Sequence, residues 1–257
     1  MATTEADRLR QFAITRRLEA AGFRAWPATS THYDGTWAVR LTTSFPAKRL
    51  NSVNPLDPSD DRDIEGRIAR ARAHFAAAGR ELIFRQSPLA PPALKAHLDA
   101  EGWESFGESV VFTADLATLD LSDALDRIPI RDAERYLDAS LRVHERPEEL
   151  RTGLAEVLAS IRPPAAYFVR EDRDGRPLAT ALAITDTAGL LAWDGTGQHH
   201  EEQVPALVAA TLERGHAQLE LLGDHGALGG ATAAQPHAHV LGLRHLLRRS
   251  GLLELGQ

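Results

Sequence analysis

A strand-like apolar run, a polar loop and a helical pattern follow one another over residues 190–212. The run ends at Trp193, and the loop that follows contains Gly195 and Gly197. Apolar side chains then recur at helical spacing from Val204 onward. A helix that begins directly after a strand presents free N–H groups, and its dipole favours an anion there. The segment therefore indicates an α/β fold and a place where an anion could bind.

The composition excludes several kinds of protein and of site. The chain has no cysteine, so disulfides, thiolate metal sites and a cysteine nucleophile are excluded. A net charge of −7 spread along the chain argues against a general nucleic-acid binder, which usually carries a basic face. The clustered arginines Arg67, Arg70 and Arg72 are interpreted as a solvated helix face rather than a phosphate site.

The N-terminus and the hydropathy pattern predict a cytoplasmic protein that does not bind membranes. The N-terminal residues have no apolar core of signal-peptide length. No apolar run approaches the length of a membrane span. A chain of 257 residues permits two domains of ordinary size.

Hydrophobic periodicity predicts an alternation of helices and strands. Helices are expected at 5–21, 63–78, 91–101, 132–144, 147–161, 204–222 and 236–250, and strands at 36–42, 49–54, 81–86, 103–116, 166–170, 177–184 and 189–193. Residues 117–133 have no sustained period, and they are interpreted as a boundary between domains at 1–117 and 118–257. A weak internal repeat, which pairs 94–103 with 243–252, supports two similar halves.

Several segments carry a resemblance to a known family. They are Trp26–Ala28, Asp34–Arg40 and Arg49–Val53 in the first half, and 177–193, Thr196 and Gly251 in the second. Over residues 5–253 the chain resembles the tandem-repeat branch of the GNAT superfamily of acetyl-CoA-dependent N-acetyltransferases. The resemblance implies an α/β (α+β) fold with two GNAT-like halves. Each half would be a mixed, mostly antiparallel sheet flanked by helices.

The resemblance also implies where acetyl-CoA, the co-substrate, would bind. In such proteins a loop of the type Arg/Gln-x-x-Gly-x-Gly/Ala holds the pyrophosphate in the C-terminal half. Aligned on Thr196, these positions are Glu201, Val204 and Ala206, of which only the alanine fits. The carboxylates of Glu201 and Glu202 should each repel phosphate by about 1 kcal/mol if solvated. The predicted coenzyme-binding residues are Trp193, Thr196, Gly197, Gln203, Val204 and Ala206.

Acyl transfer to an amine needs a base that deprotonates the amine and a hydrogen-bond donor that stabilises the oxyanion of the tetrahedral intermediate. Asp194 follows the strand that would lie beside the acyl group, and His199 and His200 lie in the loop, so these three are the candidate catalytic residues. Alternatively, Asp194 is a turn residue and the histidines are exposed loop residues. The tyrosine that the family uses as general acid is missing, because no tyrosine follows Tyr167.

A second group of residues is predicted to line a substrate cleft: Trp26, Arg40, Arg49, Asn51, Ser52 and Tyr167. The alternative is that the polar members form a structural network and the aromatic ones pack in the core. His237, His239 and His245 would diverge at the start of the last predicted helix, so no metal site is expected.

The leading functional prediction is an acyl-CoA-dependent N-acyltransferase, with acetyl-CoA or another acyl-CoA as donor and an amine of a small molecule or a protein as acceptor. The alternative is a GNAT-fold protein that has lost acetyl-CoA binding. Such a protein would serve as a non-catalytic binding or regulatory protein, or would run a different reaction on the scaffold. The sequence leaves the acceptor, the acyl group and the oligomeric state open.

Overall fold

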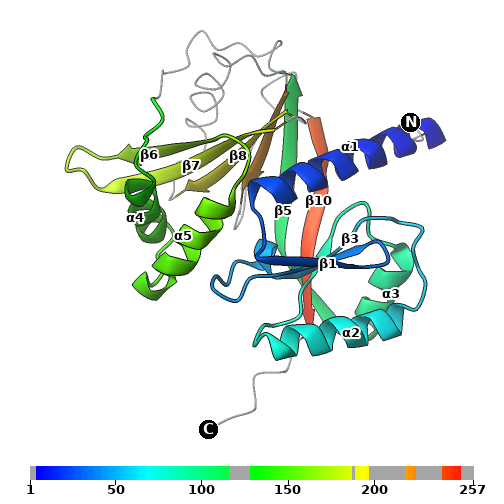
Figure 1. Cartoon of the computed structure of the whole chain (residues 1–257). Coiled ribbons are helices and arrows are strands. Elements are labelled where there is room, and N and C mark those ends of the chain that lie inside the picture. Colours follow the sequence, from blue (N-terminus) through cyan, green and yellow to red (C-terminus); the bar gives the residue numbers. More distant parts are fainter. Residues whose placement is uncertain (1–3, 116–127, 187–188, 197–217, 224–238, 250–257) are drawn as a thin grey trace. The chain divides into compact units, whose positions relative to one another are not determined.

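The computed structural model describes residues 4–115, 128–186, 189–196, 218–223 and 239–249 (Figure 1). The chain divides into two compact units. Unit 1 comprises residues 1–16, 28–109 and 242–257, and unit 2 comprises residues 17–27 and 110–241. Helix α1 (Glu5–Ala25) contributes residues to both units. None of the described helices combines the length and the apolar character needed to cross a bilayer.

The sheet of unit 1 has the strand order β1-β2-β3-β4-β10. Its strands are β1 (Ser30–Asp34), β2 (Trp37–Leu41), β3 (Ser52–Pro55), β4 (Phe84–Gln86) and β10 (His239–Arg249), of which residues 242–249 belong to unit 1. Its helices are η1 (Lys48–Leu50), α2 (Ile64–Ala77) and α3 (Pro92–Ala100). Strands β1, β2 and β3 pair antiparallel, β3 pairs parallel with β4, and β10 pairs antiparallel with β4.

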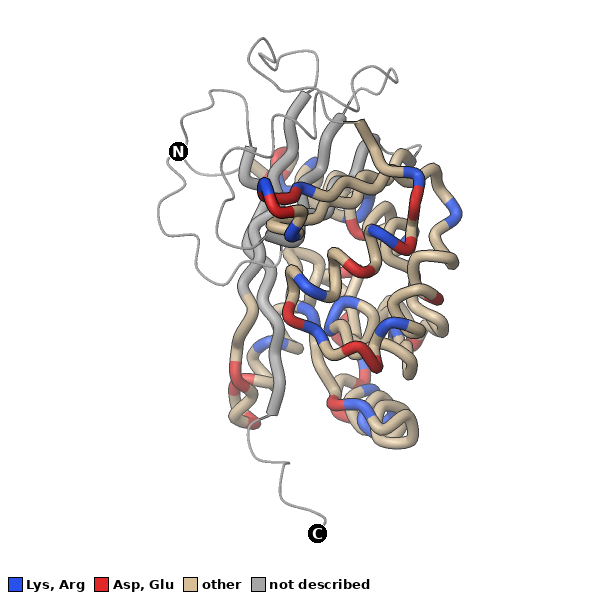
Figure 2. Tube along the Cα trace, turned by 90° about the vertical axis from the view of Figure 1, so that its left-hand side faces the viewer, with Lys and Arg blue, Asp and Glu red and all other residues tan. Residues whose placement is uncertain are grey.

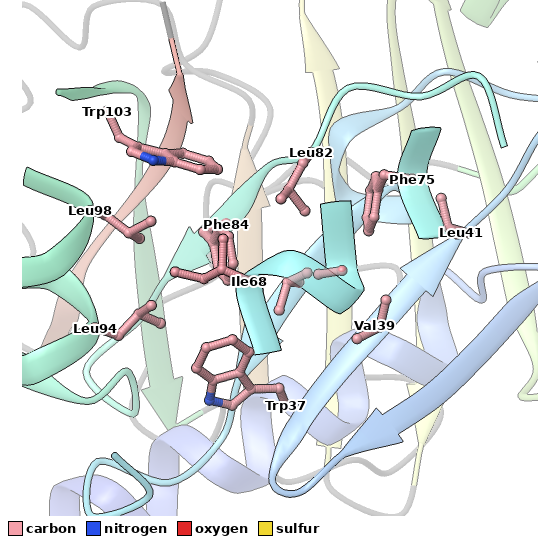
Figure 3. Packing of buried hydrophobic residues seen from close by; sticks show 12 residues of the cluster. Trp37, Val39, Leu41, Ile68, Phe75, Leu82, Phe84, Leu94, Leu98 and Trp103 are labelled. Atoms are coloured by element: carbon pink, nitrogen blue, oxygen red, sulfur yellow. The ribbon is translucent and has the colours of Figure 1, made fainter. Parts of the chain in front are cut away.

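The core of unit 1 forms where α2 and α3 pack on this sheet (Figure 3). Apolar side chains of α2 recur three and four residues apart at Ile68, Ala71 and Phe75, so they share the face that is buried. The ring of Phe84 lies edge-on to the rings of Trp37 and Trp103, with centroids 5.6 and 5.4 Å apart. These aromatic contacts join β2 and β4 to Trp103, which follows α3 in the chain.

The sheet of unit 2 has the strand order β5-β9-β8-β7-β6. Its strands are β5 (Trp103–Asp115), of which residues 110–115 belong to unit 2, β6 (Ala165–Glu171), β7 (Pro177–Asp186), β8 (Gly189–Thr196) and β9 (Gln218–Gly223). Its helices are α4 (Ala133–Val143), η3 (Glu148–Leu150) and α5 (Arg151–Ser160). Strands β6, β7 and β8 pair antiparallel, β8 pairs parallel with β9, and β5 pairs antiparallel with β9.

Helix α4 covers β6 and β7 with its apolar side. Its buried residues include Tyr136, Leu137 and Leu141, which lie on one face of the helix. The helix begins after Asp132, whose carboxylate accepts hydrogen bonds from the backbone N–H groups of Glu134 and Arg135. This cap satisfies N–H groups that the first turn of a helix leaves free.

Most of the described elements agree with the sequence predictions, but strand β1 was not predicted, and two segments predicted as helix are strands. The helix predicted over 236–250 is wrong, because residues 239–249 form strand β10. The end of the helix predicted over 204–222 is also wrong, because 218–223 form β9. Both segments pair with neighbouring strands, and this tertiary pairing overrides their helical spacing. The predicted domain boundary at 117 lies within 116–127, outside the described residues, and stays a prediction.

Candidate functional site

The parallel pair β8 and β9 determines where a ligand loop would leave the sheet of unit 2. The two strands pair from Leu190 opposite Leu219 to Asp194 opposite Gly223. Parallel neighbours cannot be joined by a tight turn, so the chain between them must return to the start of β9. The connection, residues 197–217, therefore begins at the carboxyl end of β8, where the sequence places the coenzyme loop.

The predicted catalytic and coenzyme-binding residues divide between β8 and this connection. Trp193 and Asp194 lie at the last two positions that pair with β9. Thr196 is the last residue of β8 and lies opposite Ala179 of β7. The other predicted residues, Gly197, His199, His200, Gln203, Val204 and Ala206, lie outside the described residues. The roles assigned to all of these residues stay predictions.

Unit 1 contains a second parallel pair, β3 and β4. The residues that connect these two strands all belong to the part of the chain that the structure describes. Helix α2 lies between the two strands in the sequence. The loop before it carries Asp60 and Asp63. The carboxylate of Asp63 folds over Gly66, where an added Cβ would approach it to 2.3 Å, and it pairs with Arg70 at 3.0 Å. The carboxylates beside the N-terminus of α2 disfavour a phosphate there, since like charges repel.

Asp60 forms a buried ion pair with Arg67, and each side chain is only 4% exposed. The carboxylate also accepts hydrogen bonds from the hydroxyl and the backbone N–H of Thr36, at 2.7 and 3.1 Å. Burial alone would raise the pKa of Asp60. The hydrogen bonds from Thr36 and Arg62, with the charge of Arg67, outweigh burial and hold that pKa well below its usual range.

Arg67 connects the turn of the β1–β2 hairpin to α2. Its guanidinium lies 3.9 Å from the centre of the Trp37 ring and donates to the backbone carbonyl of Asp34. Gly35 has a φ of +60°, and a Cβ there would approach the guanidinium to 2.8 Å. Interpreting Arg67 as part of a solvated face is therefore wrong, because its aromatic and carboxylate neighbours bury it. Arg70 agrees with that interpretation, since its side chain is 55% exposed.

A pocket of about 420 Å³ lies between α2 and the β1–β2 hairpin. Its lining includes His32, Tyr33, Asp34, Arg67, Arg70 and His74, with Trp37, Val39 and Ala71 as apolar wall. Sequence reasoning did not identify this pocket. Its lining residues share faces, since strand residues two apart share a face, as do helix residues three, four and seven apart. This spacing alone did not predict the pocket, because strand β1 has no apolar alternation. Among the described residues, no cluster of three or more metal-binding side chains occurs.

The predicted cleft residues of unit 1 form a buried polar network. Arg40 is 1% exposed, and its guanidinium donates to the backbone carbonyl of Arg49 at 2.8 Å. The amide of Asn51 donates to the carbonyls of Phe45 and Ala47 and accepts from the backbone N–H of Thr42.

The hydroxyl of Ser52 accepts from the amide of Asn54 at 3.2 Å. These contacts support the alternative of a structural network. A role of Arg40, Arg49, Asn51 and Ser52 in substrate binding stays a prediction.

The two predicted aromatic cleft residues lie in unit 2. Tyr167 is half-buried in β6, and its ring lies 4.9 Å from that of Tyr136 on α4. Burial raises the pKa of the Tyr167 hydroxyl. Trp26 is buried just after α1. Both residues have the surroundings of packing residues, and their place in a cleft stays a prediction.

Positively and negatively charged residues are interspersed along the described trace (Figure 2). Several of them form ion pairs that join neighbouring elements, such as Arg70 with Asp34 and Arg135 with Glu171. The described residues thus do not form an extended stretch of one charge.

Comparison with known proteins finds relatives by structure only. No protein-family model matches the chain, and no curated protein matches it. A GCN5-related N-acetyltransferase from Kribbella flavida matches with a TM-score of 0.63 at 17% identity, over 92% of this chain and 95% of that one. A GCN5-related N-acetyltransferase from Sphaerobacter thermophilus matches with a TM-score of 0.54 at 13% identity, over 77% and 72% of the two chains.

A third solved structure is a tandem GNAT protein from the clavulanic acid biosynthesis pathway. It matches with a TM-score of 0.51 at 15% identity, over 96% of both chains. Identities this low establish a shared fold and leave the reaction open. The chain therefore has an α/β fold of the GNAT type, with a mixed sheet and flanking helices.

Proposed function

We propose that the protein is an acyl-CoA-dependent N-acyltransferase that binds the coenzyme in unit 2, at the carboxyl end of β8. The observation that carries this proposal is the parallel pair β8 and β9, whose connection leaves the sheet at Thr196. A strand end that leads into a crossover is where α/β sheets commonly bind ligands. The GNAT-type fold supports the same assignment.

The proposal assigns a role to each of the three candidate catalytic residues. The coenzyme supplies a thioester, whose carbonyl carbon accepts the amine nitrogen while the carbon–sulfur bond breaks. Asp194 takes a proton from the substrate ammonium through a water molecule, so that the neutral amine can attack. His199 and His200 can return a proton to the departing thiolate, because imidazole titrates near neutral pH. This second role matters because the sequence has no tyrosine after Tyr167.

The proposal also includes two GNAT-like halves. In each unit the strands pair in the order antiparallel, antiparallel, parallel, through β1 to β4 and through β6 to β9. A fifth strand then pairs antiparallel with the last of the four, β10 with β4 and β5 with β9. Duplication of one unit would account for the repeated order.

Loss of coenzyme binding is the second candidate function, and the loop sequence favours it. Glu201 and Glu202 add negative charge where the pyrophosphate would lie, and Val204 replaces the glycine that lets the backbone approach phosphate. In this case the protein would act by binding another molecule on a GNAT-type scaffold. The two candidates differ in whether acetyl-CoA is consumed.

Release of free coenzyme A from acetyl-CoA, followed with a thiol reagent over a panel of primary amines, tests the proposal. The protein has no cysteine, so it adds no background to this assay. We expect amine-dependent thiol release. The double variant Glu201→Arg, Val204→Gly should release more thiol at subsaturating acetyl-CoA. The first change removes a carboxylate that repels phosphate, and the second lets the backbone approach the phosphate closely.

Glu213→Arg is the matched control, since it makes the same charge change farther along the same connection. Equal effects of the double variant and the control would show that the loop alignment is wrong. If neither the natural chain nor the double variant releases thiol with any amine, the non-catalytic candidate is favoured instead.

A further inference from the structure

One requirement of acyl transfer has no residue assigned to it in the proposed mechanism. When the amine attacks the thioester, an electron pair moves onto the carbonyl oxygen, and a hydrogen-bond donor has to stabilise the oxyanion that forms. Asp194 serves as the base, and His199 and His200 protonate the departing thiolate. The missing donor has to lie beside the carboxyl end of β8, because the proposal places the acyl group there.

Thr180 of β7 lies at this end of the sheet. The ladder between β7 and β8 ends with Ala179 opposite Thr196, and Thr180 lies opposite Gly195 in the pair before it. Gly195 directly follows Asp194, the candidate base. Opposite residues of an antiparallel pair have Cβ positions about 5 Å apart. A group bound over Gly195 would therefore lie within reach of the Thr180 side chain.

The hydroxyl of Thr180 is buried, and it has no hydrogen-bond partner among the described residues. The residue is only 2% exposed. Its two cross-strand neighbours offer no acceptor or donor in a side chain, since Val169 on β6 is apolar and Gly195 on β8 has no side chain. Burying a hydroxyl without a partner costs free energy, and a valine of the same shape would avoid this cost. A threonine here therefore indicates a ligand that uses the hydroxyl.

The chemistry of a threonine hydroxyl suits the missing role. The group can donate one hydrogen bond, and an oxygen that gains negative charge accepts such a bond more strongly than a neutral carbonyl does. Burial strengthens the bond further, because the interior of a protein has a lower dielectric constant than water. The hydroxyl would thus favour the transition state over the bound thioester, which is what catalysis requires.

We propose that Thr180 is a further catalytic residue, whose hydroxyl donates a hydrogen bond to the thioester carbonyl oxygen as this oxygen becomes an oxyanion. The inference rests on the proposed function. The amine nitrogen bonds to the carbonyl carbon, and the electron pair that moves to the oxygen is stabilised by Thr180. The pair then re-forms the carbonyl group, the carbon–sulfur bond breaks, and the thiolate takes a proton from a histidine. Thr180 keeps its own proton throughout.

Thiol release by the full chain, with acetyl-CoA and the most reactive primary amine, tests this role. Thr180→Val should lower kcat by about 100-fold, because loss of one oxyanion donor has an effect of this size. The affinity for acetyl-CoA, measured by calorimetry, should change by less than about twofold, since the bond strengthens only in the transition state. Thr180→Ser, which keeps the hydroxyl, should retain most of the activity.

Thr185→Val is the matched control, because Thr185 lies on the same strand and pairs with Leu190 near the other end of the ladder. It should leave kcat unchanged. Thermal unfolding separates catalysis from structure. The midpoint of Thr180→Val should not fall, because removal of an unpaired hydroxyl leaves no partner unsatisfied. A structural hydrogen bond of this hydroxyl would instead make the midpoint fall.

The role of Thr180 is overturned if Thr180→Val keeps the natural kcat, if Thr180→Ser is impaired as much as Thr180→Val, or if Thr180→Val unfolds at a lower temperature. In each of these cases the natural chain still releases thiol, so the proposed function stands. Absence of amine-dependent thiol release from the natural chain would overturn the proposed function and the role of Thr180 together.

Discussion

Asp60 and Arg67 show how two charged residues can determine a local structure. The pair is buried, and it joins the loop before α2 to the β1–β2 hairpin. Burying two charges is costly unless each has good partners. Here the hydroxyl of Thr36, a backbone carbonyl and the ring of Trp37 supply these partners. We infer that the hairpin turn depends on this pair for its position.

Asp60→Asn should lower the free energy of unfolding by roughly 3 kcal/mol, because it leaves Arg67 buried without its counter-charge. The folded state depresses the pKa of Asp60, so its contribution is present above the pKa of the unfolded chain and is lost as the pH falls toward the folded value. The natural chain should therefore lose stability below about pH 5, and the variant should lose less.

Urea unfolding at several pH values measures both effects. Asp61→Asn is the matched control, since Asp61 is the exposed neighbour in the same loop. A loss of stability in the control as large as that in Asp60→Asn would contradict the role assigned to the buried pair.

The elements show which parts of the fold local sequence determines. Helix α2 was predictable because its apolar residues recur at helical spacing along its length. Helix α4 was predictable because an amphipathic pattern follows Asp132, a residue type that commonly caps helices. Strand β10 was not, since its leucines fit a helix equally well and it becomes a strand through pairing with neighbouring strands such as β4. Strand β1 was missed because its short polar sequence, STHYD, has no apolar alternation.

The same reasoning explains what was predictable of the site. The predicted place of a coenzyme loop follows from the order of elements, and of this prediction the strand before the loop is confirmed as β8. The pocket of unit 1 was not predictable, because it depends on β1 and on two charges that long-range contacts bury.

Removal of the α4 cap is the test at the scale of an element. Asp132→Ala should lower the stability of unit 2 by about 1 kcal/mol, because two backbone N–H groups lose their acceptor. Thermal unfolding followed by circular dichroism measures the change. Glu156→Ala, on the exposed face of α5, is the control and should leave the midpoint nearly unchanged. Equal shifts would contradict the capping role.

At the scale of the whole molecule, the two units have one pairing order but different chemistry at their parallel pairs. In unit 1 the start of α2 is occupied by the chain's own carboxylates and arginines. In unit 2 the corresponding connection begins at Thr196, beside the candidate base Asp194. The central claim is therefore that the chain binds one coenzyme, in unit 2, on a GNAT-type fold.

Calorimetric titration of the full chain with acetyl-CoA tests this claim most directly. The account predicts saturable binding of one acetyl-CoA per chain, with an affinity that the double variant Glu201→Arg, Val204→Gly increases and Glu213→Arg does not. Absence of binding at millimolar acetyl-CoA in both the natural chain and the double variant, or binding of two molecules per chain, would contradict it.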